Sequence, residues 1–153
     1  MPQRKPYLLD TNVLLHWIRG SQVAKNINTQ FGLQSSSFRP LVCEVTLGEI
    51  AAFAHSSSWS VEKRKKLNEL KKKLVAVDIS DHRVIEAYAE FSSLSKSSAW
   101  AIFNDKNDLW IAAAARVSGA TLLTTDQTAF RPLLDGKHLD VILLDAKTGW
   151  KLA

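Results

Sequence analysis

The chain has 153 residues, of which 46% are hydrophobic and 23% are charged. This length and composition are typical of one compact globular domain. No apolar stretch reaches the roughly 20 residues that a membrane-spanning helix needs. The apolar run after Lys5 is interrupted by Asp10 and lacks a small-residue cleavage site, which argues against a signal peptide. We therefore expect residues 1–153 to form a single cytoplasmic domain.

Cysteine content and net charge narrow the class further. Cys43 is the only cysteine, so an internal disulfide is excluded and a reducing compartment is favoured. The net charge of +5 favours a polyanionic partner without naming one.

Short apolar runs alternate along the chain with segments whose apolar residues recur at helical spacing. The runs predict strands at 7–9, 41–43, 75–77, 121–123 and 141–144. The first predicted helix starts after Asp10, and the second covers about 23–31. The third ends near residue 54, and the fourth spans 61–74. Two more extend from the turn at 78–81 to 94 and over about 107–117. We expect residues 34–40 and the serine-rich stretch 92–98 to be irregular. Strands alternating with helices predict an α/β fold, with a mainly parallel central sheet between helical layers.

Four acidic residues occupy similar positions relative to the predicted strands. Asp10 follows the first strand, and Asp126 directly follows the strand at 121–123. Glu49 falls in about the first turn of the helix after the second strand, and Asp108 begins the helix at about 107–117. Because right-handed crossovers bring parallel strand ends to one edge of a sheet, we expect these acids to converge there.

Carboxylates that share a cleft repel one another and raise each other's pKa. Such a cluster persists at neutral pH when a hard divalent cation neutralises it. Mg²⁺ suits the task because it takes few carboxylates and leaves coordination sites for phosphate oxygens. One or two such ions can generate hydroxide and stabilise an in-line displacement at phosphorus.

A purely structural interpretation of the same acids is also open. Asp10 can cap a helix, and Asp108 can complement a helix dipole. Thr46 to Glu49 fits a capping box, and Thr124 to Gln127 contains a second one. The spacing of these residues does not separate a set of caps from a metal site.

The order and context of the four acids resemble those of PIN-domain nucleases, and more closely the VapC-like toxins of toxin–antitoxin pairs. The resemblance covers nearly the whole chain. It rests on Leu9-Asp10-Thr11-Asn12-Val13-Leu14, Val45-Thr46-Leu47-Gly48-Glu49-Ile50, Asn107-Asp108-Leu109-Trp110-Ile111-Ala112-Ala113 and Leu122-Leu123-Thr124-Thr125-Asp126, with Phe130 after them.

This resemblance implies a three-layer PIN fold and a Mg²⁺- or Mn²⁺-dependent endoribonuclease that cleaves RNA. It assigns the metal site and catalysis to Asp10, Glu49, Asp108 and Asp126, with Asp10 as the central ligand. Asn12 and Thr124 match positions that support the site in the family. The implied partners are a cognate antitoxin that blocks the active site and, in a homodimer, a second copy of the chain.

The chain departs from the family pattern in two places. Some relatives carry a further acid just after the position of Asp126, where this sequence has Gln127 and Thr128. The number of metal ions is therefore open. The stretch from Ser95 to Asp105 is longer than in compact relatives, and we interpret Asp105 as a loop or cap residue.

The predicted helix at 61–74 carries a basic stretch, Lys63 to Lys73, around its leucines. Three interpretations are open: a solvated helix face, an electrostatic contact with the RNA backbone, or a docking surface for an acidic antitoxin segment.

Two other functions compete with the nuclease. The first is a non-enzymatic PIN-like binding module whose carboxylates are only caps. The second is an aspartate-nucleophile phosphatase in which Asp10 attacks phosphate. Those phosphatases typically place a second Asp two residues further on, where this chain has Asn12.

Overall fold

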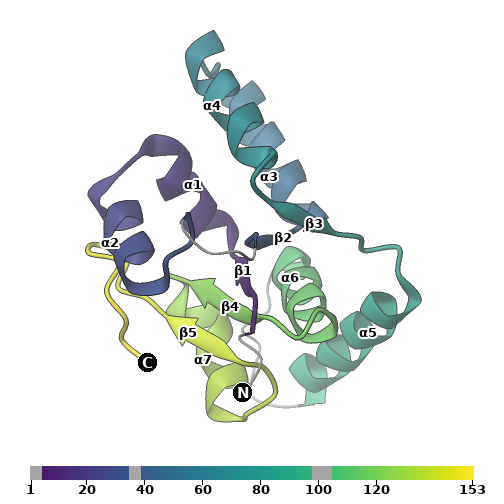
Figure 1. Cartoon of the computed structure of the whole chain (residues 1–153). Helices are drawn as coiled ribbons and strands as arrows, with labels where there is room; N and C mark the ends of the chain where they lie inside the picture. Colours follow the sequence, from purple (N-terminus) through teal and green to yellow (C-terminus); the bar gives the residue numbers. More distant parts are fainter. Residues whose placement is uncertain (1–4, 35–38, 98–104) are drawn as a thin grey trace.

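The computed structural model describes residues 5–34, 39–97 and 105–153. In this part of the chain, one parallel sheet has the strand order β3-β2-β1-β4-β5 (Figure 1). The strands are β1 (Tyr7–Leu9), β2 (Leu41–Cys43), β3 (Val75–Val77), β4 (Thr121–Thr124) and β5 (Val141–Leu143). The helices are α1 (Thr11–Arg19), α2 (Gln22–Phe31), α3 (Glu44–Ser56), α4 (Val61–Lys71), α5 (His82–Ser97), α6 (Lys106–Val117) and α7 (Gln127–Asp135).

The sheet lies between two hydrophobic cores. Successive residues of a strand face opposite sides of the sheet. Leu8 and Leu122 therefore pack with α5, α6 and α7, whereas Leu9 and Leu123 pack with α1, α2 and α4. This three-layer arrangement confirms the predicted α/β class. No helix in the described part of the chain is long and apolar enough to cross a membrane.

Helix α6 is the central helix that its sequence predicts. Leu109, Ile111 and the four alanines from Ala112 to Ala115 are all buried. Gly119 has a φ of +65° just after the helix, a conformation that glycine adopts readily. The expected helix and its glycine terminus are both confirmed.

Two expectations about helices were wrong. Residues 92–97 are helical, because α5 continues to Ser97; serine weakens a helix only slightly, and the buried Val84, Ala87 and Phe91 anchor it. Helix α4 ends at Lys71 rather than at residue 74. The structure also contains α7, for which no helix is predicted from the sequence; Pro132 lies inside it.

Two predicted irregular stretches are only partly covered. Gln34 lies in a turn and residues 39–40 have no regular structure, whereas 35–38 fall outside the described residues. In the stretch from Ser95 to Asp105, residues 98–104 fall outside as well. Asp105 is the N-cap of α6, as one of our interpretations held.

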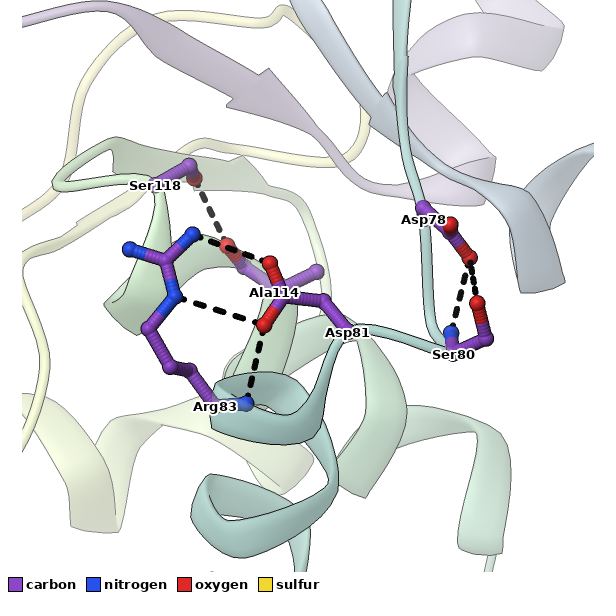
Figure 2. A network of polar contacts seen from close by, with 6 residues as sticks. All are labelled: Asp78, Ser80, Asp81, Arg83, Ala114 and Ser118. Atoms are coloured by element: carbon purple, nitrogen blue, oxygen red, sulfur yellow. Dashed lines mark hydrogen bonds and ion pairs between the residues drawn. The ribbon is translucent and has the colours of Figure 1, made fainter.

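The predicted turn between β3 and α5 is held by its own side chains (Figure 2). The Asp78 carboxylate accepts hydrogen bonds from the backbone N and the Oγ of Ser80, both at 2.8 Å. The Asp81 carboxylate accepts from the backbone N and the guanidinium of Arg83. These contacts lower the pKa of both aspartates. Figure 2 also shows the end of α6, where Ser118 Oγ donates to the Ala114 carbonyl oxygen at 2.6 Å.

Candidate active site

The strand order creates a switch point between β1 and β4. From β1 the chain builds the sheet outward through β2 to β3, and it later adds β4 and β5 on the opposite side of β1 (Figure 1). In open α/β sheets, ligands bind outside the carboxyl ends of the strands at such a point. Asp10 follows β1 and Asp126 lies two residues beyond β4, so both flank the switch point.

The Asp10 carboxylate is buried, with 4% of the residue exposed. Its Oδ1 accepts a hydrogen bond from the Thr11 backbone N at 2.8 Å, and its Oδ2 accepts one from Thr124 Oγ1 at 2.6 Å. Burial raises the pKa of Asp10 to about 6, and repulsion from Asp126 and Glu49 adds to this effect, while the two hydrogen bonds oppose it. Asp10 is thus an N-cap of α1 and also a carboxylate in an unfavourable environment.

Glu49 is not part of a capping box. Helix α3 begins directly at the end of β2, with Cys43 as an N-cap that makes no side-chain hydrogen bond. Thr46 is therefore the third residue of the helix and Glu49 lies in its second turn, so the predicted capping box and first-turn position were wrong. The Glu49 Oε1 instead accepts a hydrogen bond from Thr11 Oγ1 at 2.8 Å.

Asp108 lies in the first turn of α6, where Asp105 provides the cap. Because α6 leads into β4, it runs opposite to the strands, and its N-terminus lies at their carboxyl edge. Burial raises the pKa of Asp108 to about 7, with further contributions from Asp10, Asp105, Asp126 and Glu49. Within the described part of the chain, no hydrogen bond or ion pair to its carboxylate offsets this repulsion.

Asp126 caps α7, since its Oδ1 accepts from the Ala129 backbone N at 3.1 Å. The fully buried Thr124 links it to Asp10: Thr124 Oγ1 accepts from the Asp126 backbone N at 2.9 Å and donates to Asp10. Asn12 Oδ1 accepts from the Thr125 backbone N at 3.4 Å. Asn12 and Thr124 therefore join the ends of β1 and β4.

The cap interpretation accounts for only part of this cluster. Asp10 and Asp126 act as caps, whereas the cap beside Asp108 is Asp105, and Glu49 lies beyond the first turn of its helix. Repulsion from the other three acids helps to raise the pKa of Asp108, and repulsion from Asp126 and Glu49 helps to raise that of Asp10. The structure therefore brings the four predicted residues into one electrostatic cluster.

The donor set fits a hard cation that keeps much of its water. All four side chains offer carboxylate oxygens, and none forms an ion pair with a basic residue in the described ranges. Among the described residues, no group of three or more acidic, histidine or cysteine side chains forms a ready-made metal cage. Mg²⁺ usually takes only one or two carboxylates directly and retains several waters, so it does not need such a cage.

Sequence reasoning missed two threonines in this region. The hydroxyls of Thr11 and Thr46 lie 3.0 Å apart, although the residues are 35 positions apart in the chain. Both lie in stretches that carry the family resemblance, but nothing in the sequence indicates that they touch.

Part of the basic helix has a structural role. The Arg64 guanidinium in α4 donates to the carbonyl oxygens of Ala54 at 3.0 Å and Trp59 at 3.2 Å. The Lys63 ammonium lies 4.1 Å from the centre of the Trp59 ring. Lys65 and Lys66 are exposed, so they remain available to a partner.

A protein-family model and several solved structures match this chain. Residues 7–132 match the family model described as PIN domain, a range that contains all four acids. No curated protein sequence matches the chain. Three similar solved structures share only 20% or 21% sequence identity with this chain, so they show a shared fold and no more.

Three similar solved structures illustrate the likeness. A chain of VapBC-1 from nontypeable Haemophilus influenzae is 21% identical, with a TM-score of 0.68 over 90% of this chain and 96% of that chain. A chain of VapBC2 from Rickettsia felis, bound to a DNA fragment from its promoter, is 20% identical, with a TM-score of 0.72 over 91% of this chain and 98% of that chain. A chain of FitAcB from Neisseria gonorrhoeae is 20% identical, with a TM-score of 0.62 over 88% of this chain and 95% of that chain. The family match, the fold and the position of the acids lead to one conclusion: the chain belongs to the PIN domain family.

Proposed function

We propose that this protein is a Mg²⁺- or Mn²⁺-dependent endoribonuclease whose metal site is formed by Asp10, Glu49, Asp108 and Asp126, bound to the ion directly or through its waters. The observation that supports this best is a buried carboxylate surrounded by other carboxylates. Asp10 is buried, and both its pKa and that of Asp108 are raised in part by neighbouring acids. A divalent cation would relieve this repulsion.

The chain's own residues would set the geometry of the reaction. Asp10 is the central ligand, held by the Thr11 backbone N and the Thr124 hydroxyl. Glu49, Asp108 and Asp126 complete the site and orient water. When bound, the cation supplies Lewis acidity and an acidified water for in-line displacement at phosphorus.

RNA is the substrate that the family resemblance points to. The net charge of +5 suits a polyanion, and sequence-selective RNA recognition usually targets unpaired loops and ends. We therefore propose cleavage within unpaired RNA segments.

Calorimetric titration of Mn²⁺ tests the metal site. We expect the wild-type protein to bind Mn²⁺ and Asp10→Asn to lose binding. The matched control is Asp135→Asn, which removes an exposed carboxylate at the end of α7 and should bind like the wild type. Cleavage of a single-stranded RNA should follow the same order among the three proteins.

The same titration discriminates the second candidate, a non-enzymatic PIN-like binding module. The cap roles of Asp10 and Asp126 favour that candidate. If neither the wild type nor Asp10→Asn binds Mn²⁺ and both are folded, the nuclease proposal fails and the binding module replaces it.

We further propose that an antitoxin is the partner, as the toxin–antitoxin structures similar in fold suggest. A groove of about 690 Å³ lies between α1, α2 and α4. Apolar residues including Val13, Ile18 and Leu70 line it, and Lys65 and Lys66 lie beside them. Such a surface is complementary to an acidic amphipathic helix.

We also expect a homodimer, which light scattering would check.

Binding of the protein encoded beside this gene tests the antitoxin proposal. Lys65→Glu combined with Lys66→Glu should weaken binding at least about tenfold through like-charge repulsion. Lys71→Glu combined with Lys72→Glu makes the same charge change at the C-terminal end of α4, at two residues that do not line the groove, and should change binding little. Equal losses in the two double variants would show that net charge, and not the groove, governs binding.

A further inference from the structure

Thr46 is a fully buried polar residue that its own helix does not use. It lies in the first turn of α3, where the N-cap is Cys43. Its hydroxyl instead meets the Thr11 hydroxyl of α1 at 3.0 Å. A buried hydroxyl needs a partner, and this one finds it on another helix.

Thr11 contacts two acids of the candidate active site at once. Its backbone N donates to Asp10 Oδ1, and its Oγ1 donates to Glu49 Oε1, each at 2.8 Å. A hydroxyl has one proton, so a Thr11 hydroxyl that donates to Glu49 can only accept from Thr46. The direction of the chain is therefore fixed: Thr46 donates to Thr11, and Thr11 donates to Glu49.

We propose that Thr46 and Thr11 form a relay that positions the Glu49 carboxylate beside Asp10. The relay holds one oxygen of Glu49, so the other oxygen keeps a defined direction into the cluster. It also ties α3 to the start of α1. Glu49 is the one acid of the four on a second helical turn, and its flexible side chain has three rotatable bonds to restrain. Both threonines are positioning residues, and their role rests on the proposed metal-dependent nuclease.

The relay makes a specific prediction about Thr46. Thr46→Val keeps the shape of the side chain but removes the hydroxyl, whereas Thr46→Ser keeps the hydroxyl and removes a methyl group. Loss of a residue that orients a metal ligand typically costs 10–100-fold in metal affinity or activity. We therefore expect Thr46→Val to bind Mn²⁺ about tenfold more weakly and to cut RNA with a lower kcat and an unchanged KM. Thr46→Ser should retain wild-type affinity.

A double-mutant cycle separates the relay from simple packing. Thr46 acts on Glu49 only through Thr11, so Thr46→Val should cost nothing further in a Thr11→Val background. The measurements are Mn²⁺ affinity by calorimetry and thermal unfolding of the metal-free protein for all four members of the cycle. Valine has nearly the same volume as threonine, so Thr46→Val should still fold. The unfolding curves check this for each variant.

Three outcomes are possible, and each is informative. Weaker binding in Thr46→Val, rescue in Thr46→Ser and a non-additive cycle support the relay. Wild-type affinity in Thr46→Val, or a larger loss in Thr46→Ser than in Thr46→Val, overturns it and leaves Thr46 as a packing residue. Absence of Mn²⁺ binding in the wild type overturns the proposed function itself, which is a separate result.

Discussion

At the scale of single residues, Asp10 is held where its charge is disfavoured. Burial takes its carboxylate out of water, and the nearby Asp126 and Glu49 repel it. Its two hydrogen bonds only partly compensate, so the pKa remains at about 6. The native state therefore holds the Asp10 proton more tightly than the unfolded chain does.

The pH dependence of stability follows from this difference. A raised carboxyl pKa makes the metal-free protein lose stability as pH rises from about 4 to above 6. One pKa unit corresponds to about 1.4 kcal/mol, so Asp10 contributes a loss on the order of 3 kcal/mol. Asp10→Asn should remove this loss and make the dependence shallower, while the raised pKa of Asp108 leaves a remaining loss of the same sign. Urea unfolding with a chelator at about pH 4.5 and about pH 7.5 checks it; the same pH slope in both proteins would contradict the prediction.

Thr124 is the residue that most directly stabilises the charged Asp10. Thr124→Val keeps the volume but leaves Asp10 Oδ2 and the Asp126 backbone N without their partner. We expect a loss of about 1–3 kcal/mol in the free energy of unfolding, the usual cost of an unsatisfied buried polar group. Thr124→Ser, which keeps the hydroxyl, should lose less. Urea unfolding measures both variants, and an equal loss in Thr124→Ser would show that the hydroxyl bonds alone do not account for the role of Thr124.

At the scale of elements, α3 and α4 extend from the sheet to the top of the view in Figure 1. Arg64 connects them by donating to two carbonyl oxygens, Ala54 near the end of α3 and Trp59 in the connection. A cation at a helix C-terminus also interacts favourably with the helix dipole.

Loss of this arginine should therefore loosen the α3–α4 connection. Arg64→Ala should destabilise the protein by roughly 1–2 kcal/mol and reduce hydrogen-exchange protection at residues 57–59. Lys65→Ala, on the exposed face of the same helix, should change stability by less than about 0.5 kcal/mol. Protection that is unchanged in Arg64→Ala would show that the helices hold each other by packing alone.

Helices α5 and α7 show how packing overrides local sequence signals. The serines at the end of α5 and the proline inside α7 both argue for irregular structure. In each case buried apolar residues decide the outcome: Val84 and Phe91 in α5, and Phe130 and Leu133 in α7. Pro132 is the sixth residue of α7, so it forgoes one hydrogen bond that the buried side chains offset.

At the scale of the whole molecule, the C-terminal segment beyond the family match is tied to α2. Gln30 donates to the Gly149 carbonyl oxygen at 2.7 Å and accepts from the Lys151 backbone N at 2.9 Å. Gly149 has a φ of +82°, and a Cβ added there would lie 2.6 Å from the Val23 carbonyl oxygen. The close approach of this segment to α2 therefore requires glycine.

Two glycine substitutions test this packing. Gly149→Ala combines backbone strain with a steric clash, and we expect it to cost about 1–3 kcal/mol more than strain alone. Gly20→Ala is the matched control, because Gly20 has a φ of +61° but open space at the Cβ position, so it should cost only about 1–2 kcal/mol. Thermal or urea unfolding gives both values. Equal losses would mean that the C-terminal segment moves away from α2 without cost.

The sequence by itself determined the strands, most of the helices and the local position of each acid. These features depend on neighbours within a few residues, whose apolar spacing the sequence displays directly. It also predicted that Asp10 and Asp126 follow strands, and the parallel register confirms that they share an edge. Only the tertiary structure decided which groups touch across that edge. The contacts of Thr46 with Thr11 and of Thr124 with Asp10 join residues 35 and 114 positions apart. Such pairs depend on strand order and helix packing, which no local pattern encodes.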